Sequence, residues 1–463
     1  MTNLLTDSKT FNTLLKNFTP QITEQLTIDS LTNAPITLYY GLTPLNKSTR
    51  TKFQKVIEEL KIKEKIALIL NNQPWNRSEN KSVEHHQCRT INPPTWISSE
   101  QTKWTLFYTK TKSQFTDIVQ VGIGGSELGP KALIHALQNN YKQLATPHFM
   151  SSIDTFSIEK KLNSLNLETT LFIIVSKSGT TTETQYIWTK IKEHWKKNSL
   201  LLEKLKQHSI SVTCPNTPLD NPAEFQHCFY IQPSIGGRFS ISSAVGGVIT
   251  SLIYGPDCFN EFLTGANALD PPNIEIDIQK NSALLNACLT ITYRNLCHYP
   301  TSAIIPYSNA LKYIPNYLQQ LICESNGKSK SMNGKTLPYA TNPAIMTGIG
   351  TNAQHSTFQQ FYEGSDIIPV TFIGIQNNAL LNKHISAQAI ALHKKNRPNT
   401  IIMLKNLSAY SIGALISFYE NTVLFEGLLW GINSFDQPGI ELGKTLLKEN
   451  SPKVKALHSK LMK

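Results

Sequence analysis

One segment of the sequence combines the residue types that bind a phosphate group. Five apolar residues, Leu171 to Val175, predict a buried strand, and a hydroxyl-rich stretch from Ser176 to Thr182 follows directly. Thr180 and Glu183 have capping-box spacing, which predicts that a helix begins here. Backbone N–H groups at a helix N-terminus attract anions, and Lys177 adds a positive charge. We therefore predict a phosphate-binding loop, the alternative being an ordinary Ser/Thr-rich helix cap.

A glycine-rich turn lies upstream of this loop. Asp117 to Val121 predicts a strand, Gly122 to Ser126 a tight turn, and Pro130 to Leu137 a helix. The glycines approach the dinucleotide-binding fingerprint, but Glu127 stands where its third glycine is required. This departure argues against a cofactor-dependent dehydrogenase. Two neighbouring strand-to-helix turns could instead share one ligand at the carboxyl edge of a sheet.

A general base is suggested by Glu324, a carboxylate on an otherwise apolar predicted helix. Gln320 precedes it by four positions, so both side chains lie on one side of the helix. Partial burial would raise the pKa of the carboxyl group toward neutrality, as a general base requires. The alternative is an exposed glutamate at a helix end. Gly327-Lys328-Ser329 also echoes a P-loop, but Ile322 occupies the position of its first glycine.

Three further side chains are candidates for a catalytic role. Arg238 follows a glycine pair and precedes an apolar helix, although it could be a surface turn residue. His355 follows a predicted strand at a strand-to-helix turn, where ligands bind in such folds, although most lone histidines are structural. Lys444 ends a polar, turn-rich segment after a long apolar helix, where a solvated lysine is the alternative.

The chain's composition narrows the class of protein. Its 463 residues suggest two or three domains, and an apolar content of 40% supports sizeable cores. The net charge of +12 comes from scattered lysines and arginines, which favours attraction of small anions over nucleic-acid binding. Seven irregularly spaced cysteines indicate reduced thiols in a cytoplasmic protein.

Other classes fit the sequence poorly. The N-terminal residues lack a signal peptide, and Glu420, Asn421 and Glu426 interrupt the most apolar segment, so we expect no membrane span. We also expect no metal site, because neither short grouping of candidate ligands has metal-binding spacing. These groupings are His85, His86 and Cys88, and Cys297 with His298.

Strands alternate with helices in both halves of the chain, which predicts two doubly wound α/β domains with mainly parallel sheets. We place a helical N-terminal segment at residues 1–45, domains at 46–265 and 266–445, and a basic helix or tail at 446–463. Besides the strands named above, predicted strands are Ile210 to Thr213, Ala303 to Pro306, Ala344 to Thr347, Ile368 to Ile375 and Thr400 to Leu404, with a helix from Asn316 to Cys323.

Taken together, these motifs resemble the glucose-6-phosphate isomerase family, in particular its shorter bacterial members. The similar segments occur in the family's order. They are VGIGGSELGP (121–130), SKSGTTTET (176–184), GGRFS (236–240), QLICESNGKS (320–329), GTNAQHS (350–356) and GINSFDQPGIELGK (431–444).

The resemblance implies two sugar-isomerase domains, a homodimer with shared active sites, and glycolytic and gluconeogenic interconversion of glucose 6-phosphate and fructose 6-phosphate without metal or cofactor. It makes Glu324 the proton-shuttling base and Arg238 the group that stabilises the enediolate, with His355 and Lys444 assisting ring opening. The implied substrate and phosphate contacts are Gly125, Ser126, Ser176, Lys177, Ser178, Thr181, Gln320 and Gln437.

The main rival from another class is a phosphosugar-sensing regulator built on the same type of domain. Such a protein would keep the phosphate loop but would need neither Glu324, His355 nor Lys444. It would usually carry a DNA-binding helix-turn-helix, and the sequence shows no pattern typical of one.

Overall fold

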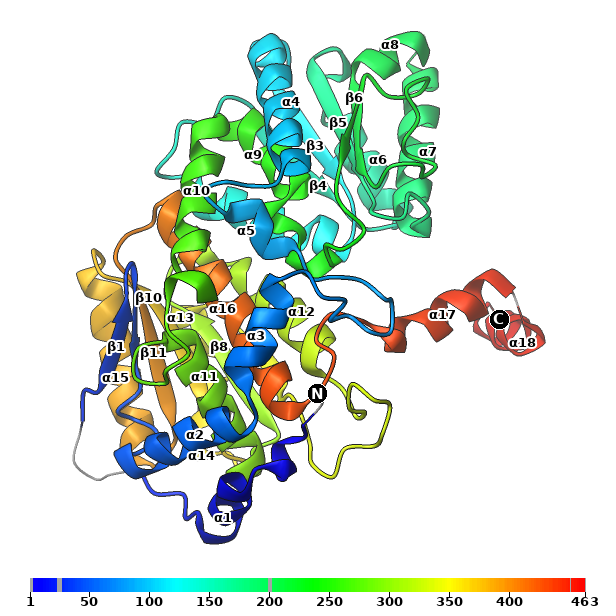
Figure 1. Cartoon of the computed structure of the whole chain (residues 1–463). Coiled ribbons are helices and arrows are strands. Elements are labelled where there is room, and N and C mark those ends of the chain that lie inside the picture. Colours follow the sequence, from blue (N-terminus) through cyan, green and yellow to red (C-terminus); the bar gives the residue numbers. More distant parts are fainter. Residues whose placement is uncertain (1–2, 23–26, 199–201, 450, 463) are drawn as a thin grey trace.

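The computed structural model describes residues 3–22, 27–198, 202–449 and 451–462. Two sheets form two bodies that lie one above the other in Figure 1. The first sheet has five parallel strands in the order β4-β3-β5-β6-β7. These strands are β3 (Asp117–Val121), β4 (Thr146–Met150), β5 (Thr170–Val175), β6 (Ser209–Thr213) and β7 (His227–Tyr230).

Helices cover both faces of the first sheet, as the unbroken apolar run of β5 requires. Leu171, Ile173 and Val175 share a core cluster with one set of helices, and Phe172 and Ile174 share another cluster with a second set. Because successive side chains of a strand point to opposite faces, both faces of β5 are buried. The first set is α4 (Thr95–Thr111), α5 (Leu128–Leu137) and α9 (Ala244–Tyr254), and the second is α6 (Thr155–Asn163), α7 (Thr182–Lys197) and α8 (Leu202–Gln207).

The second sheet has six strands in the order β1-β2-β11-β10-β8-β9. Its last four strands are parallel, and an antiparallel hairpin completes one edge. The strands are β1 (Ser30–Asn33), β2 (Ile36–Tyr39), β8 (Thr301–Pro306), β9 (Ala344–Thr347), β10 (Val370–Ile375) and β11 (Asn399–Leu404). One face packs on α14 (Phe358–Glu363) and α15 (Ala379–Lys394), and the other on α11 (Ser282–Ile291), α12 (Ile314–Asn326) and α16 (Ala409–Trp430).

Helix α16 is the central helix of the larger core. It contacts α10 (Pro256–Ala268), α11 and α12, and it passes through the middle of the lower body in Figure 1. Among the described residues it is the one helix long and apolar enough to cross a membrane. Its apolar segment is completely buried inside the molecule, as expected of a core helix that protein surrounds on every side.

The N-terminal residues differ from the helical segment that we predicted for 1–45. Helix α1 (Lys9–Asn17) is present, but β1 and β2 follow it and extend the second sheet. Ile36 and Leu38 are buried while Thr37 and Tyr39 are partly exposed. This alternation is typical of a strand but too short to be recognised alone. Helices α2 (Lys47–Glu59) and α3 (Ile62–Leu70) contact α1 and α16, so they pack with the second sheet rather than the first.

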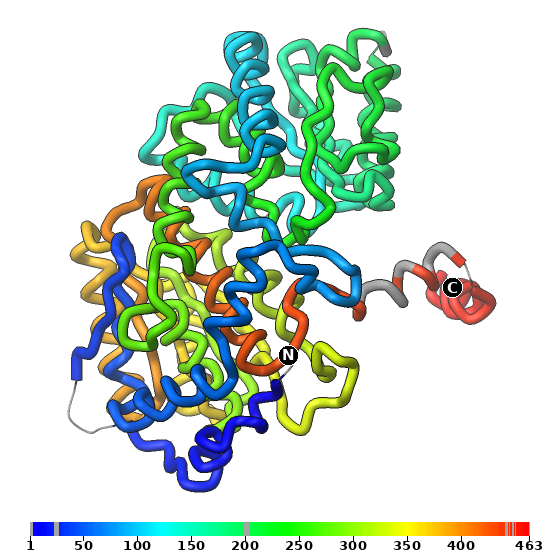
Figure 2. The backbone as a smooth tube through the Cα atoms, viewed as in Figure 1, coloured from blue at the N-terminus to red at the C-terminus, as the bar shows by residue number. Residues whose placement is uncertain are grey.

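The C-terminal part contains α17 (Pro438–Glu449) and α18 (Pro452–Leu461). Figure 1 shows α18 lying apart from the two sheets, and the tube in Figure 2, drawn from the same side, shows the same for the C-terminal end of the chain. Helix α18 occupies the segment that we predicted to be a basic helix or tail.

Candidate active site

Loops from both bodies meet at one place, and glycine residues permit their close approach. A Cβ atom on Gly125 would lie 2.1 Å from the carbonyl oxygen of Gly237, so only glycine fits between these two turns. The neighbouring Gly124 lies against Gln320, whose Nε2 atom is 2.9 Å from the position of a Cβ. The turn after β3, the segment of Arg238 and helix α12 are therefore in mutual contact.

Arg238 is the buried cation of this site. It is only 1% exposed, and its Nε donates to Ser325 Oγ at 2.5 Å. Its Nη2 donates to the carbonyl oxygens of Ser434 at 2.5 Å and Asp436 at 3.1 Å. Burial lowers the pKa of the guanidinium group, while the carboxylates of Glu324 and Asp436 oppose this shift. The guanidinium plane is thus fixed by α12 and by the turn after α16.

Glu324 lies where this buried cation meets an open cleft. Its carboxylate pairs with Arg238 Nη1 at 3.1 Å and accepts a hydrogen bond from Gln320 Nε2 at 2.9 Å. Arg238 Nη1 also donates to Gln437 Oε1 at 2.9 Å. Glu324 is 19% exposed and lines a cleft of about 490 Å³. A small substrate in that cleft could reach the carboxylate, so the position suits a general base. The other lining residues are Leu128, Asn316, Gln319, Gln320 and Cys323.

The predicted phosphate loop connects β5 to α7, but its helix cap differs from our prediction. The N-cap residue is Thr181 rather than Thr180, and its side chain makes no capping hydrogen bond. Instead, the hydroxyls of Ser176 and Thr181 are 2.8 Å apart, and the Thr180 hydroxyl donates to Ser178 Oγ. Because no side chain among the described residues caps the helix, the N–H groups in the first turn of α7 remain available to a ligand.

Lys177 links this loop to the segment of Arg238. Its Nζ donates to the carbonyl oxygen of Ile235 at 2.8 Å, three residues before the arginine. Burial lowers the pKa of the ammonium group. Gly179 has a φ of +66°, a left-handed conformation that favours glycine and turns the chain into α7. The loop is therefore held beside the arginine segment.

If this loop binds phosphate, Ser176→Ala combined with Thr181→Val should weaken binding of the sugar phosphate and of inorganic phosphate together. Each lost hydrogen bond to a charged group costs roughly 1.5–3 kcal/mol. The measurement is competitive inhibition by inorganic phosphate, with Thr189→Val as a control because Thr189 is an exposed threonine later on α7. Equal inhibition constants for the parent and the double variant would show that the loop does not hold the anion.

One predicted site residue, His355, is not assembled with Glu324 in the single chain. His355 is exposed at the C-terminal end of α13 (Gly350–Gln354). Among the described residues, no hydrogen bond or ion pair joins its ring to Glu324 or Arg238. Lys444 belongs to α17, and its side chain lies outside those that the structure describes.

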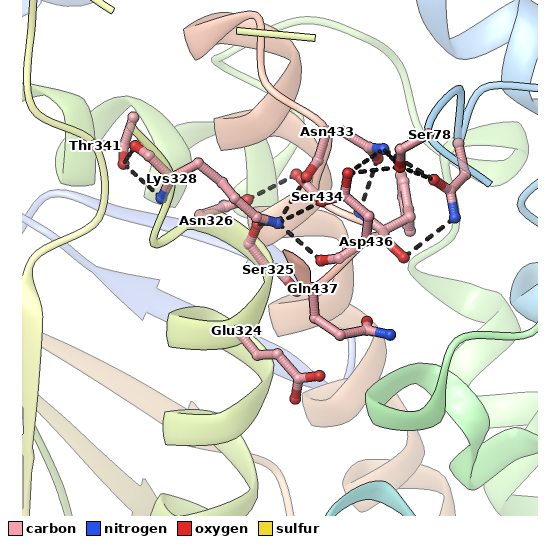
Figure 3. Close-up of polar contacts among 12 residues, drawn as sticks. Ser78, Glu324, Ser325, Asn326, Lys328, Thr341, Asn433, Ser434, Asp436 and Gln437 are labelled. Atoms are coloured by element: carbon pink, nitrogen blue, oxygen red, sulfur yellow. Dashed lines mark hydrogen bonds and ion pairs between the residues drawn. The ribbon is translucent and has the colours of Figure 1, made fainter. Parts of the chain in front are cut away.

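Two charged residues that we did not predict, Lys328 and Asp436, organise the site. Lys328 donates from Nζ to the carbonyl oxygens of Ser325, Asn433 and Asp436, and to Asp436 Oδ1 at 2.9 Å. Figure 3 shows this lysine between the end of α12 and the turn that carries Gln437. Its place directly after the helix of Glu324 was the available signal, but we considered it only as part of a failed P-loop.

Of the residues considered and set aside as metal ligands, His85, His86 and Cys88 are buried, whereas Cys297 is half-buried and His298 is exposed. His85 and His86 are buried in a short 3-10 helix, and the His85 ring centroid is 4.7 Å from that of Phe239. Burial lowers the pKa of both imidazoles. Within the described ranges, no three His, Cys, Asp or Glu side chains lie close enough together to hold a metal ion.

Comparisons with known proteins agree with this arrangement. The family model for phosphoglucose isomerase matches residues 98–392 and 376–460. A glucose-6-phosphate isomerase from Chlamydia pneumoniae is 41% identical over 73% of this chain and 69% of its own. One from Treponema denticola is 36% identical over 89% of this chain and 86% of its own. The crystal structure of a glucose-6-phosphate isomerase from Chlamydia trachomatis superposes with a TM-score of 0.91, at 30% identity and 99% coverage of both chains. The chain therefore belongs to the phosphoglucose isomerase family.

Proposed function

We propose that this protein is an aldose–ketose isomerase that interconverts glucose 6-phosphate and fructose 6-phosphate. The observation that carries the proposal is the Glu324 carboxylate, placed on an open cleft between Arg238 and Gln320. Similarity to relatives named glucose-6-phosphate isomerase supports the same reaction. A coupled assay that oxidises newly formed glucose 6-phosphate, with fructose 6-phosphate as the only substrate, tests it.

In the open-chain aldose, Glu324 takes the proton from C2 while the carbonyl at C1 gains negative charge. The product is a cis-enediolate; transfer of the O2 proton to O1 and return of the proton from Glu324 to C1 then yield the ketose. The guanidinium of Arg238 is already desolvated and oriented, so its positive charge stabilises the enediolate oxygen. No electrons enter or leave, because the oxidation of one carbon balances the reduction of the other.

The phosphate end of the substrate would be held at the first sheet. We assign it to the loop after β5 together with the turn after β3, which meet at the same carboxyl edge. The residues are Gly125, Ser126, Ser176, Lys177, Ser178 and Thr181. Gln320 and Gln437 stand beside Glu324 and Arg238, so we assign them to sugar hydroxyls.

Ring opening needs a proton donor and acceptor at the ring oxygen and C1 hydroxyl, and we assign these roles to His355 and Lys444. The exposed position of His355 supports its acting in the site of a second subunit. We therefore propose a homodimer with shared sites. Seven cysteines without disulfides support a cytoplasmic location, where thiols stay reduced.

A subunit-mixing experiment tests the shared site. Glu324→Gln and His355→Ala homodimers should each be almost inactive, because every site carries one defect. After the two are unfolded and refolded together, heterodimers should have one intact site and one doubly defective site. Random mixing should then restore about a quarter of the parent activity, since half of the dimers are heterodimers with one working site of two. Inactive heterodimers of verified composition would assign His355 to its own chain or to no site.

A further inference from the structure

A polar cavity of about 50 Å³ lies inside the second body, between α16 and one face of the sheet. Its walls include Glu426, Tyr293, Tyr419 and Asn342. Among the described residues, no hydrogen-bond partner reaches the two tyrosine hydroxyls or Asn342 Oδ1, and all three atoms are buried. Buried polar atoms are nearly always paired, and a cavity of this size admits ordered water.

Among the described residues, Glu426 is the one carboxyl group in the wall of this cavity. It is 3% exposed, and within the described part of the chain no ion pair neutralises it. The titratable groups around it are the phenols of Tyr293 and Tyr419, which the cavity also contains. Burial raises the pKa of Glu426 to about 7, against hydrogen bonds from Thr290 and Asn326. Burying a carboxyl group with no neutralising charge costs free energy, so its presence here requires an explanation.

A continuous series of contacts leads from Glu426 to the catalytic arginine. Asn326 Nδ2 donates to Glu426 Oε2 at 2.9 Å, and Asn326 Oδ1 accepts from Ser434 Oγ at 2.7 Å. The Ser434 carbonyl oxygen in turn accepts from Arg238 Nη2 at 2.5 Å. Figure 3 shows Asn326 and Ser434 facing each other above Glu324. A Cβ atom on Gly427 would lie 1.9 Å from Ser434 Oγ, so α16 also limits where this serine can sit.

We propose that Glu426 is a positioning residue, which orients Asn326 and thereby holds the Ser434 turn that fixes the Arg238 guanidinium. The proposal rests on the isomerase function assigned above and adds a residue with no contact to substrate. Loss of the Glu426 carboxyl group should lower kcat, because Arg238 stabilises the charge that develops during the reaction. The phosphate loop is on a different element, so KM should change little.

Four variants test the proposal: Glu426→Leu, Glu426→Gln, Ser434→Ala, and Glu426→Leu combined with Ser434→Ala. Leucine removes the acceptor, so kcat should fall roughly ten- to a hundredfold at near-constant KM, the scale of a small misplacement in a catalytic site. Glutamine keeps an acceptor oxygen and should restore most of kcat. The double variant should lose no more than the worse single variant, because both changes break one series of contacts.

The pH dependence of stability supplies an independent readout. In the folded protein the pKa of Glu426 lies above its ordinary value of 4.5, so the folded state keeps a proton that the unfolded state has lost. The melting temperature of the parent should therefore fall relative to Glu426→Gln as the pH rises from about 4.5 to about 7. A constant difference across that range would contradict the buried carboxyl group's titration.

Unchanged kcat in a folded Glu426→Leu protein, failure of glutamine to rescue, or additive losses in the double variant would each overturn the proposal. If the leucine variant does not fold, Gly427→Ala takes its place: it keeps Glu426 but displaces Ser434, and unchanged kcat would equally overturn it. Loss of the proposed function is distinguishable from these results. If the parent protein has no isomerase activity, the proposed function is rejected. The contact series can still be tested by the melting temperatures, where the effects of Glu426→Leu and Ser434→Ala should be non-additive.

Discussion

Replacing Glu324 by glutamine is expected to lower kcat by about a hundredfold to ten-thousandfold, with little change in KM. Glutamine has nearly the shape of glutamate, and it can still contact Arg238 and Gln320 through its amide. It cannot accept the proton from C2 of the sugar. The loss should therefore be confined to the chemical step while the substrate still binds.

Steady-state kinetics of the purified variant, with circular dichroism to confirm folding, checks this result. Glu193→Gln is a suitable control, since Glu193 is an exposed glutamate of α7 that pairs with Lys190. Normal turnover by a folded Glu324→Gln protein would remove Glu324 from the mechanism. The family assignment would stand, but the base would have to be another group on the cleft.

Arg238→Lys should also lower kcat by about a hundredfold or more, although the positive charge is retained. The guanidinium uses donors on all three nitrogens to contact two elements and the Glu324 carboxylate. A lysine ammonium has three donors and a different shape, so it cannot reproduce these contacts together. The enediolate would then face a misplaced charge.

The comparison of Arg238→Lys with Arg50→Lys separates this effect from a general consequence of losing an arginine. Arg50 lies outside the site and pairs with Asp29 near the second sheet. Kinetic constants and melting temperatures of both variants should be measured side by side. Near-normal kcat for Arg238→Lys would show that charge alone is sufficient at this position.

Much of the sheet architecture was predictable from local pattern. The apolar runs of β3 and β9 are confirmed with the bounds that we predicted, and those of β5, β8, β10 and β11 within a few residues. Parallel strands buried on both faces carry continuous apolar runs, and these are the clearest strand signals in a sequence. The α/β class and the mainly parallel sheets followed from them.

Four strands, three of them at sheet edges, were missed because their setting leaves little sequence pattern, although the edge strand β9 was predicted. β4 and β7 lie at the two edges of the first sheet, and most of their side chains are partly exposed. Thr146–Met150 contains a proline and a histidine, which weaken the strand signal. β1 and β2 are only four residues each; β1 has no buried residue, and β2 pairs with the distant β11.

The site residues likewise divide into those that local motifs predict and those whose contacts depend on packing. Individual motifs placed Glu324, Arg238 and the phosphate loop at element ends, where the structure has them. Distances between them depend on how the two bodies pack, which local sequence does not encode. The contacts of Lys328 with the turn after α16 are of this kind, since they join residues more than a hundred positions apart.

The most direct test of the central claim is to follow glucose 6-phosphate by proton NMR in D₂O with the purified protein. Proton transfer through an enediolate predicts that fructose 6-phosphate forms and that solvent deuterium enters at C1, because a proton held on Glu324 can exchange before it returns. The Glu324→Gln protein should show neither conversion nor exchange on the same timescale. Absence of ketose with the folded parent protein, or ketose formed with no deuterium under any condition, would contradict the account.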